Sequence, residues 1–157
     1  MVKKLLFVCL GNICRSPAAH GIMQKMVDEA GLSSQIYIDS AGMGGWHVGN
    51  LPDPRMRKHA AWRNYDLTHR ARQFKPEDFG KFDLIFVMDE ENYHDVSRQA
   101  PSDEAMKKVH YLAEYLSAHP HDKVIPDPYY GGDQGFENVL DLLEDACQTL
   151  LSVIQEK

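Results

Sequence analysis

The apolar residues of this chain follow two patterns that alternate along the sequence. Short apolar runs predict strands at 4–9, 35–40, 82–88 and 109–112. Apolar residues at helical spacing predict a helix at 17–30, and further helices are expected at 55–63 and 90–99, with a helical turn near 76. The longest apolar stripe predicts a last helix and comprises Phe136, Val139, Leu140, Leu143, Ala146, Cys147, Leu150, Leu151 and Ile154.

Strands that alternate with helices predict an α/β fold, in which helices cover both faces of a parallel sheet. The crossovers between parallel strands are right-handed. In sheets of this kind, ligands bind beyond the carboxyl ends of the strands. The first predicted strand ends at Cys9, so the segment that follows Cys9 is the first candidate site.

The segment from Cys9 to Ser16 has the composition of a tight loop that leads into a helix. Gly11 permits a sharp backbone path, and Asn12 tolerates left-handed dihedral angles. Ser16 followed by Pro17 predicts a helix with a serine cap and a proline in its first position. The N–H groups of such a loop and the positive end of the helix together bind oxyanions.

Two side chains of this loop suit chemistry on a bound phosphate. The field that attracts an anion also favours the thiolate form of Cys9, which is the nucleophilic form of cysteine. The guanidinium of Arg15 offers a planar fork to two phosphoryl oxygens. Nucleophile and anion site coincide, as transfer of a phosphoryl group to sulfur requires.

Composition limits the classes to which the chain can belong. Its 157 residues, 43% of them hydrophobic, predict a single domain over 1–157. The net charge of −6 disfavours nucleic-acid binding, and the absence of a long apolar run disfavours a membrane protein. Three cysteines are too few for a disulfide scaffold, which favours a reducing, cytoplasmic setting. The basic stretch at 55–72 is either a solvated face or a docking surface for a partner.

The loop resembles the phosphate-binding loop of the low molecular weight protein tyrosine phosphatases, and the resemblance covers essentially the whole chain. It implies a three-layer sandwich around a four-stranded parallel sheet of order 2-1-3-4, with the phosphate loop after strand 1. It also implies hydrolysis of protein phosphotyrosine and aryl phosphates through a cysteinyl-phosphate on Cys9, with Arg15 as the phosphate clamp and with no metal or cofactor. The loop would further comprise Leu10, Gly11, Asn12, Ile13, Cys14 and Ser16.

Asp127 lies between two prolines, in a segment that resembles the general-acid loop of the same family. By itself, an Asp-Pro pair is typical of a turn. Because the chain also has a nucleophilic loop, we expect Asp127 to protonate the leaving phenolate oxygen, a role that contributes about 10²–10⁴-fold to the rate. Trp46, Tyr129 and Tyr130 are the candidates for aromatic walls around a phenyl ring.

The resemblance also implies residues that support the loop. Asn12 would be held in a left-handed conformation through contacts with Ser40 and His69, although His69 is equally compatible with a surface position. A glutamate commonly occupies one position of the first helix in this family, and this chain has His20 there.

Other positions leave two roles open. Ser16 would either cap the helix or donate its hydroxyl to the Cys9 sulfur. Asp89 would either pair with an arginine near the cleft or cap the helix after it. Cys14 would either form a reversible disulfide with Cys9, which makes the protein redox-regulated, or be a small buried residue. Cys147, on the apolar stripe, is expected to be structural.

Two other functions are compatible with an anion-binding loop. A thiol-dependent arsenate reductase would need further cysteines to relay a disulfide, and 88–99 contains none. A non-catalytic phosphoprotein-binding module would not need Cys9, Arg15, Ser16 and Asp127 together. As partner we expect a phosphotyrosine-containing protein, with a tyrosine kinase as one candidate, and we expect the chain to be a monomer or to self-associate weakly.

Overall fold

The computed structural model describes residues 2–119, 122–129 and 132–156. Four parallel strands form a sheet in the order β2-β1-β3-β4, which confirms the expected order. The strands are β1 (Lys3–Cys9), β2 (Ile36–Gly42), β3 (Leu84–Val87) and β4 (Val109–Tyr111). The helices are α1 (Arg15–Glu29), α2 (Pro54–Trp62), α3 (Asp78–Lys81), α4 (Glu90–Ser97), α5 (Asp103–Met106), the 3-10 helix η1 (Leu112–Tyr115) and α6 (Asp133–Gln155).

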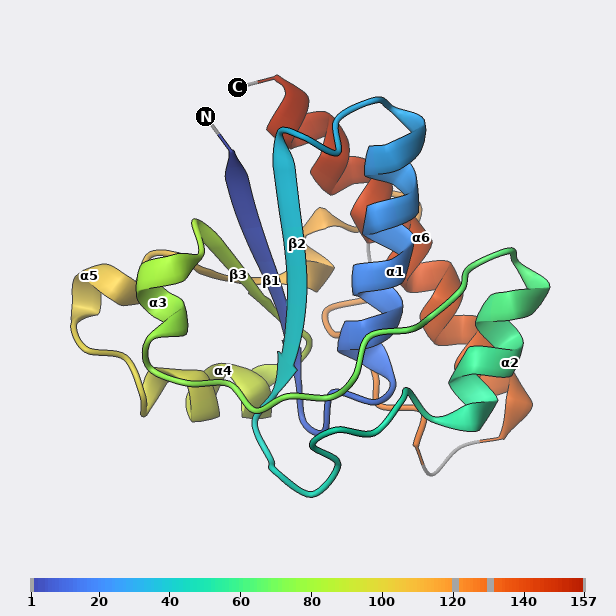
Figure 1. The fold of residues 1–157 in the computed structure, drawn as a ribbon, viewed down its shortest axis with the longest axis horizontal. Coiled ribbons are helices and arrows are strands. Elements are labelled where there is room, and N and C mark those ends of the chain that lie inside the picture. The colour runs from blue at the N-terminus through green and yellow to red at the C-terminus, as the bar shows by residue number, and fades with distance from the viewer. Residues whose placement is uncertain (1, 120–121, 130–131, 157) are drawn as a thin grey trace.

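The central strand β1 is apolar on both faces and is buried on both. Leu5, Phe7 and Cys9 point into one core, and Leu6 and Val8 point into the other. Helices α1, α2, α6 and η1 pack on the first face, and α3, α4 and α5 pack on the second (Figure 1). The sheet and its two helical layers form the expected three-layer sandwich.

Helix α6 packs its apolar stripe against α1 and η1. Phe136, Val139 and Leu140 are at most 1% exposed, and burial of each such side chain contributes about 1.5–3 kcal/mol. Cys147 is also fully buried, with its sulfur 3.9 Å from the carbonyl oxygen of Ala19, as expected of a structural thiol. Among the described residues, no helix has both the length and the apolar character needed to cross a membrane.

The start of α1 differs from the prediction. Cys14 takes the cap position without a side-chain hydrogen bond to the helix, and Ser16 and Pro17 lie inside its first turn. The prediction of a serine cap followed by proline in the first position is therefore wrong. The Ser16 hydroxyl instead contacts the sulfur of Cys9, so the loop and not the helix end uses it.

Strand β2 continues to Gly42, which is the register partner of Cys9. A Cβ atom at Gly42 would lie 2.7 Å from the carbonyl carbon of Gly11 and 2.8 Å from the backbone nitrogen of Asn12. A glycine is therefore required where the end of β2 meets the loop.

Candidate active site

The loop between β1 and α1 is fixed by hydrogen bonds to its carbonyl groups. Asn12 has a φ angle of 56°, in the left-handed region that asparagine tolerates. The carbonyls of Cys9, Leu10, Ile13 and Cys14 accept hydrogen bonds from the N–H groups of Met43, Gly44, Asp53 and Ala18, in that order. Because these carbonyls bond to neighbouring segments, the loop can present its N–H groups to an oxyanion.

Ser16 lies beside the Cys9 sulfur. Its Oγ is 3.0 Å from Cys9 Sγ, accepts a hydrogen bond of 2.7 Å from Asn12 Nδ2, and lies 3.3 Å from the carbonyl oxygen of Ala41. Asn12 and Ser16 are fully buried, and Cys9 is 3% exposed. Since Asn12 already supplies a proton to Ser16 Oγ, the hydroxyl proton can be donated to the sulfur or to the Ala41 carbonyl.

The Arg15 guanidinium is held by two acceptors on one side. Its Nη1 donates to Asp89 Oδ2 at 2.7 Å and to the Ile125 carbonyl at 3.0 Å. Burial alone would lower the pKa of Arg15, but the charges of Cys9 and Asp89 outweigh this and raise it. Asp89 also accepts a hydrogen bond from the N–H of Asn92 and caps α4, so it meets both roles that the sequence left open.

Asp127 reaches the same place from the loop before α6. Its Oδ2 lies 3.6 Å from Arg15 Nη2, and its Oδ1 accepts a hydrogen bond of 3.0 Å from the N–H of Tyr129. The loop is anchored at its start by the fully buried Ile125, whose N–H donates to the Met88 carbonyl at 2.9 Å. The carboxyl group is therefore held near the clamp.

These groups share a pocket of about 250 Å³. Its lining comprises Cys9, Leu10, Gly11, Ile13, Cys14, Arg15, Trp46, His47, Asp127 and Tyr129. Trp46 is 71% exposed, and its indole lies against the backbone of Gly44, where a Cβ atom would come within 1.9 Å of the ring. Tyr130, the third predicted wall residue, lies outside the described residues. The pocket thus combines a buried sulfur and guanidinium with aromatic rings nearer the surface.

The sequence did not indicate one residue that lines the pocket, His47, and one that holds a lining residue, Arg55. His47 faces Tyr129, with ring centroids 6.4 Å apart, and its only sequence signal was its position next to Trp46. Arg55 donates to the Tyr129 carbonyl at 2.8 Å, and its guanidinium lies 5.4 Å from the centre of that ring. The sequence could have placed Arg55 only at the start of a helix that Asp53 caps.

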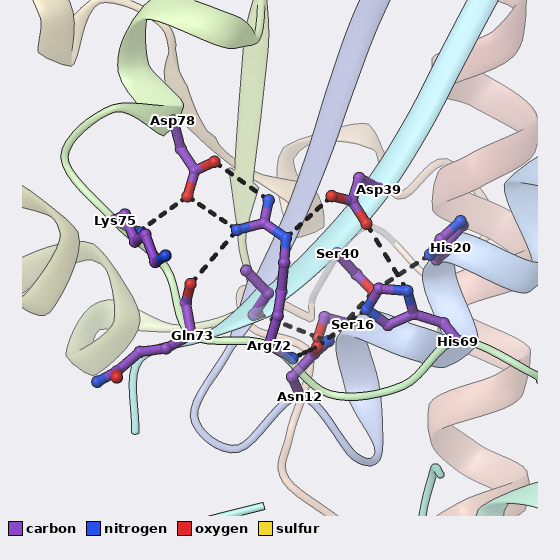
Figure 2. A network of polar contacts seen from close by, with 11 residues as sticks. Asn12, Ser16, His20, Asp39, Ser40, His69, Arg72, Gln73, Lys75 and Asp78 are labelled. Carbon is purple, nitrogen blue, oxygen red and sulfur yellow. Dashed lines mark hydrogen bonds and ion pairs between the residues drawn. The ribbon is translucent and has the colours of Figure 1, made fainter. Parts of the chain in front are cut away.

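A network of side chains supports Asn12 (Figure 2). Asn12 Nδ2 donates to Ser40 Oγ at 3.1 Å, and Asn12 Oδ1 accepts from His69 Nε2 at 3.1 Å and from the N–H of Arg72 at 3.0 Å. His20 joins through its Nδ1, which lies 3.2 Å from Ser40 Oγ, and its ring centroid is 5.0 Å from that of His69. The structure therefore brings Asn12, Ser40 and His69 together as the resemblance implied, and His20 fits into the same network.

Both histidine rings of this network favour the neutral form. Burial and the charge of His69 lower the pKa of His20 to about 4, against a weaker opposing effect of Asp39. Burial also lowers the pKa of His69, an effect that Asp39 opposes and Arg72 reinforces. Removal from water disfavours the charged imidazolium in both cases.

The Arg72 side chain is fixed by two carboxylates (Figure 2). Its Nε donates to Asp39 Oδ2 at 2.9 Å, and its Nη1 and Nη2 donate to the two oxygens of Asp78 at 3.1 Å each. The sequence did not reveal this clamp because Asp39 and Arg72 belong to distant segments.

Other basic residues of the stretch at 55–72 form ion pairs as well. Arg55 pairs with Asp53, and Arg63 pairs with Glu137, Asp141 and Glu144. Much of the basic stretch at 55–72 thus forms intramolecular ion pairs.

Comparison with known proteins agrees with this geometry. A model of the low molecular weight phosphotyrosine protein phosphatase family matches residues 4–157. A low molecular weight protein-tyrosine-phosphatase of Streptomyces coelicolor is 41% identical over an alignment of 158 positions, which covers 100% of this chain and 96% of that protein. A low molecular weight phosphotyrosine protein phosphatase of Schizosaccharomyces pombe is 42% identical, with 96% of each chain covered.

A solved structure extends the match to three dimensions. The crystal structure of a protein tyrosine phosphatase from Entamoeba histolytica, with Hepes in its active site, aligns with a TM-score of 0.92 and 41% identity. The alignment covers 98% of this chain and 97% of that chain. Sequence, fold and loop agree, and the chain belongs to the low molecular weight phosphotyrosine protein phosphatase family.

Proposed function

We propose that this protein hydrolyses phosphotyrosine in phosphoproteins, with Cys9 as the nucleophile, Arg15 as the phosphate clamp and Asp127 as the general acid and base. The observation that carries the proposal is the meeting of all three side chains in one pocket. The separation of 3.6 Å between Arg15 Nη2 and Asp127 Oδ2 supports it, because one phosphate can then contact both groups. Family membership supports the same activity.

In the first step, the thiolate of Cys9 attacks phosphorus, and the S–P bond forms as the P–O bond to the phenol breaks. Asp127 gives its proton to the departing phenolate oxygen. Arg15 and the N–H groups of the loop stabilise the charge on the equatorial oxygens. Asp89 and Ile125 hold Nη1 of the guanidinium, which orients the remainder toward the phosphate.

In the second step, water attacks the phosphorus of the cysteinyl-phosphate. Asp127, now a carboxylate, takes a proton from this water, and the S–P bond breaks to release phosphate and the Cys9 thiolate. The Ser16 hydroxyl lies 3.0 Å from the sulfur and can donate its proton to the developing negative charge. Asn12 assists because its amide N–H occupies a lone pair of Ser16 Oγ and leaves the hydroxyl proton for the sulfur.

The shape of the pocket supports tyrosine over serine. Cys9 is 3% exposed, whereas the side chain of Trp46 is largely in solvent. A phenyl ring is long enough to bring phosphorus to the sulfur while its faces contact Trp46 and Tyr129. A phosphoserine side chain is shorter and would leave the aromatic walls without contacts. A tyrosine-rich segment of a kinase is one substrate of this kind.

The test is phosphate release from matched phosphotyrosine and phosphoserine peptides in reducing buffer that contains a chelator. We expect release from the phosphotyrosine peptide alone, and none with Cys9→Ser. A Cys147→Ala variant, changed in the core and away from the pocket, should retain the activity. Equal release from both peptides, or release that survives Cys9→Ser, would contradict the proposal.

A parent protein that releases no phosphate would turn attention to the two rival functions. Thiol-dependent reduction of arsenate and binding of the phosphopeptide without turnover would then be measured on the same samples. The burial of Cys147 in the core disfavours the reductase, because a disulfide relay needs cysteines that can approach one another.

A further inference from the structure

Three potential metal ligands converge beside the phosphate loop but do not line the phosphate pocket. His20 comes from α1, Asp39 from β2, and His69 from the segment between α2 and α3 (Figure 2). One donor atom from each lies within 4.8 Å of the other two. We propose that His20, Asp39 and His69 form a binding site for a divalent transition-metal ion of the Zn²⁺ type, linked to the phosphate loop through Asn12.

The donor set and its spacing suit such an ion. Two imidazole nitrogens and one carboxylate oxygen are typical ligands of Zn²⁺, with water as a fourth. The ligand atoms of a tetrahedral ion with bonds of about 2.0–2.2 Å lie roughly 3.4 Å apart. His69 Nδ1 and Asp39 Oδ1 are 3.7 Å apart, close to that spacing and longer than a hydrogen bond. Small side-chain rotations would close the remaining distances.

The hydrogen bonds around His69 fix which ring nitrogen can bind the ion. The N–H of Arg72 can only donate, so the Asn12 atom that faces it is the carbonyl oxygen, Oδ1. That oxygen can only accept, and therefore His69 Nε2 carries a hydrogen and donates to it. In the neutral ring the lone pair is then on Nδ1, which faces Asp39. A histidine that binds a metal through one ring nitrogen usually donates a hydrogen bond from the other nitrogen to a carbonyl or a carboxylate. The hydrogen bond from His69 Nε2 to Asn12 Oδ1 is of this kind.

The other two ligands are oriented in the same manner. Arg72 Nε donates to Asp39 Oδ2 at 2.9 Å, which leaves Asp39 Oδ1 directed at His69. His20 Nδ1 lies 3.2 Å from Ser40 Oγ, which holds the ring in place, and one nitrogen of this ring belongs to the convergent set of donor atoms. The guanidinium of Arg72 offsets part of the Asp39 charge, so affinity must come largely from the imidazoles. This favours Zn²⁺ or Co²⁺ over Mg²⁺ or Ca²⁺, which prefer oxygen ligands.

The ligands are accessible, and binding would be felt at the phosphate loop. His20 and His69 both line a surface groove beside α1. The side chains of His69 and Asp39 are 19% and 18% exposed, so an ion has a route to them. His69 holds Asn12, whose left-handed conformation shapes the loop. An ion on His69 would therefore strengthen or shift the support of the phosphate loop.

The test uses Zn²⁺ and Co²⁺ salts as probes, in the Cys9→Ser background, which removes the pocket thiolate as a competing metal ligand. Calorimetric titration should show one Zn²⁺ ion per chain and no binding of Mg²⁺. Loss of a hydrogen-bond partner of a metal ligand lowers metal affinity by roughly 10–100-fold, and loss of a ligand itself should cost at least as much. We therefore expect His20→Gln to weaken Zn²⁺ binding by at least that factor. His94→Gln, which changes an exposed histidine of α4, should leave the affinity unchanged.

A second readout needs no substitution in the cluster. Paramagnetic Co²⁺ should broaden the ring-proton resonances of His20 and His69 and leave those of His94 sharp. No Zn²⁺ binding in the Cys9→Ser protein, unchanged affinity in a folded His20→Gln variant, or broadening confined to other histidines would each overturn the proposal. The test is independent of phosphatase activity, so it distinguishes this site from the proposed function.

Discussion

Arg15 meets three groups through the two terminal nitrogens of one guanidinium. Nη1 contacts Asp89 and the Ile125 carbonyl, and Nη2 faces Asp127. A lysine would keep the charge, but its single ammonium cannot bond to these anchors and to two phosphoryl oxygens together. Geometry as well as charge therefore determines what this position contributes.

We accordingly expect Arg15→Lys to lower kcat/KM for a phosphotyrosine peptide by about 10²-fold or more, the loss typical of removing a donor to transition-state charge. Arg98→Lys is the matched control, since the Arg98 side chain is 77% exposed. Steady-state kinetics on both variants checks the prediction. Turnover near that of the parent in Arg15→Lys would show that a point charge suffices.

Cys14 supports a second prediction at this scale. Burial, with a contribution from the Asp53 charge, raises the pKa of the Cys14 thiol, so it stays protonated at neutral pH. If peroxide converts Cys9 to a sulfenic acid, Cys14 loses its proton as its sulfur attacks the Cys9 sulfur, and the proton leaves with the displaced hydroxide as water. The product is a disulfide that thiols reduce. We expect Cys14→Ser to recover less activity than the parent after peroxide and then dithiothreitol.

The control for this experiment is Cys147→Ala, because Cys147 lies in the core. It should recover as fully as the parent. Equal recovery in Cys14→Ser and the parent would exclude a protective disulfide, and mass spectrometry of the oxidised parent would show whether Cys9 and Cys14 are linked.

At the scale of elements, β2 and the phosphate loop approach each other closely at Gly42. Its missing side chain leaves room for the backbone of Gly11 and Asn12, at 2.7 Å and 2.8 Å from a Cβ position. Gly42→Ala should force the loop away from β2, lower stability by about 1–3 kcal/mol as overpacking does, and reduce kcat. Urea denaturation and steady-state kinetics measure the two effects.

Gly80→Ala in α3 is the control, because no atom outside its chain neighbours and the backbone of its own helix lies within 4 Å of its Cβ position. In a helix this change should be neutral or stabilising, by about 0.5–1 kcal/mol. A Gly42→Ala variant with the stability and turnover of the parent would mean that the loop can move without consequence.

The elements themselves could be predicted because their signals are local. The apolar run before Cys9 and the stripe from Phe136 onward each lie within one segment, and both elements formed as expected. The start of α1 could not be predicted in this way. Ser16 before Pro17 looks like a cap, but tertiary contacts draw its hydroxyl to Cys9.

The residues missed at the site share one cause. Arg55 contacts Tyr129 across 74 positions, and Arg72 contacts Asp39 across 33. Such pairs have no local sequence pattern, because only the tertiary fold brings their segments together. Asn12, Ser40 and His69 could be anticipated only through the family resemblance, for the same reason.

In the molecule as a whole, the phosphate loop is supported from both helical layers. His20 in α1 contacts Ser40 on one side, and Asp78 in α3 holds Arg72 on the other. Both Ser40 and Arg72 contact Asn12. Ser40 Oγ accepts a hydrogen bond from Asn12 Nδ2, and the backbone N–H of Arg72 donates to Asn12 Oδ1. The two layers are thereby joined at the residue whose conformation shapes the phosphate loop.

A carboxylate of the C-terminal helix holds the segment that precedes the acid loop. Asp145 in α6 accepts hydrogen bonds from the N–H groups of Ser117, Ala118 and His119 and from His119 Nδ1, at distances between 3.0 and 3.2 Å. Its side chain is 7% exposed. Burial alone would raise the pKa of Asp145, but the hydrogen bonds from His119, Ala118 and Ser117 outweigh it and hold the pKa below its usual value.

A carboxyl group whose pKa is lowered by folding stabilises the protein above the pKa of the unfolded chain, about 3.9 for aspartate, and this contribution is lost as pH falls through the folded value. The free energy of unfolding should therefore decline below about pH 4. Asp145→Asn should lower stability at pH 7 by on the order of 1–2 kcal/mol, because a charged acceptor becomes neutral. It should also reduce the loss of unfolding free energy at acid pH.

Asp66→Asn, which changes an exposed aspartate, is the control and should leave the stability at pH 7 and its decline at acid pH unchanged. Urea denaturation of the three proteins between neutral and acid pH measures this, and a parallel acid decline in Asp145→Asn and the parent would assign the acid sensitivity to other carboxylates.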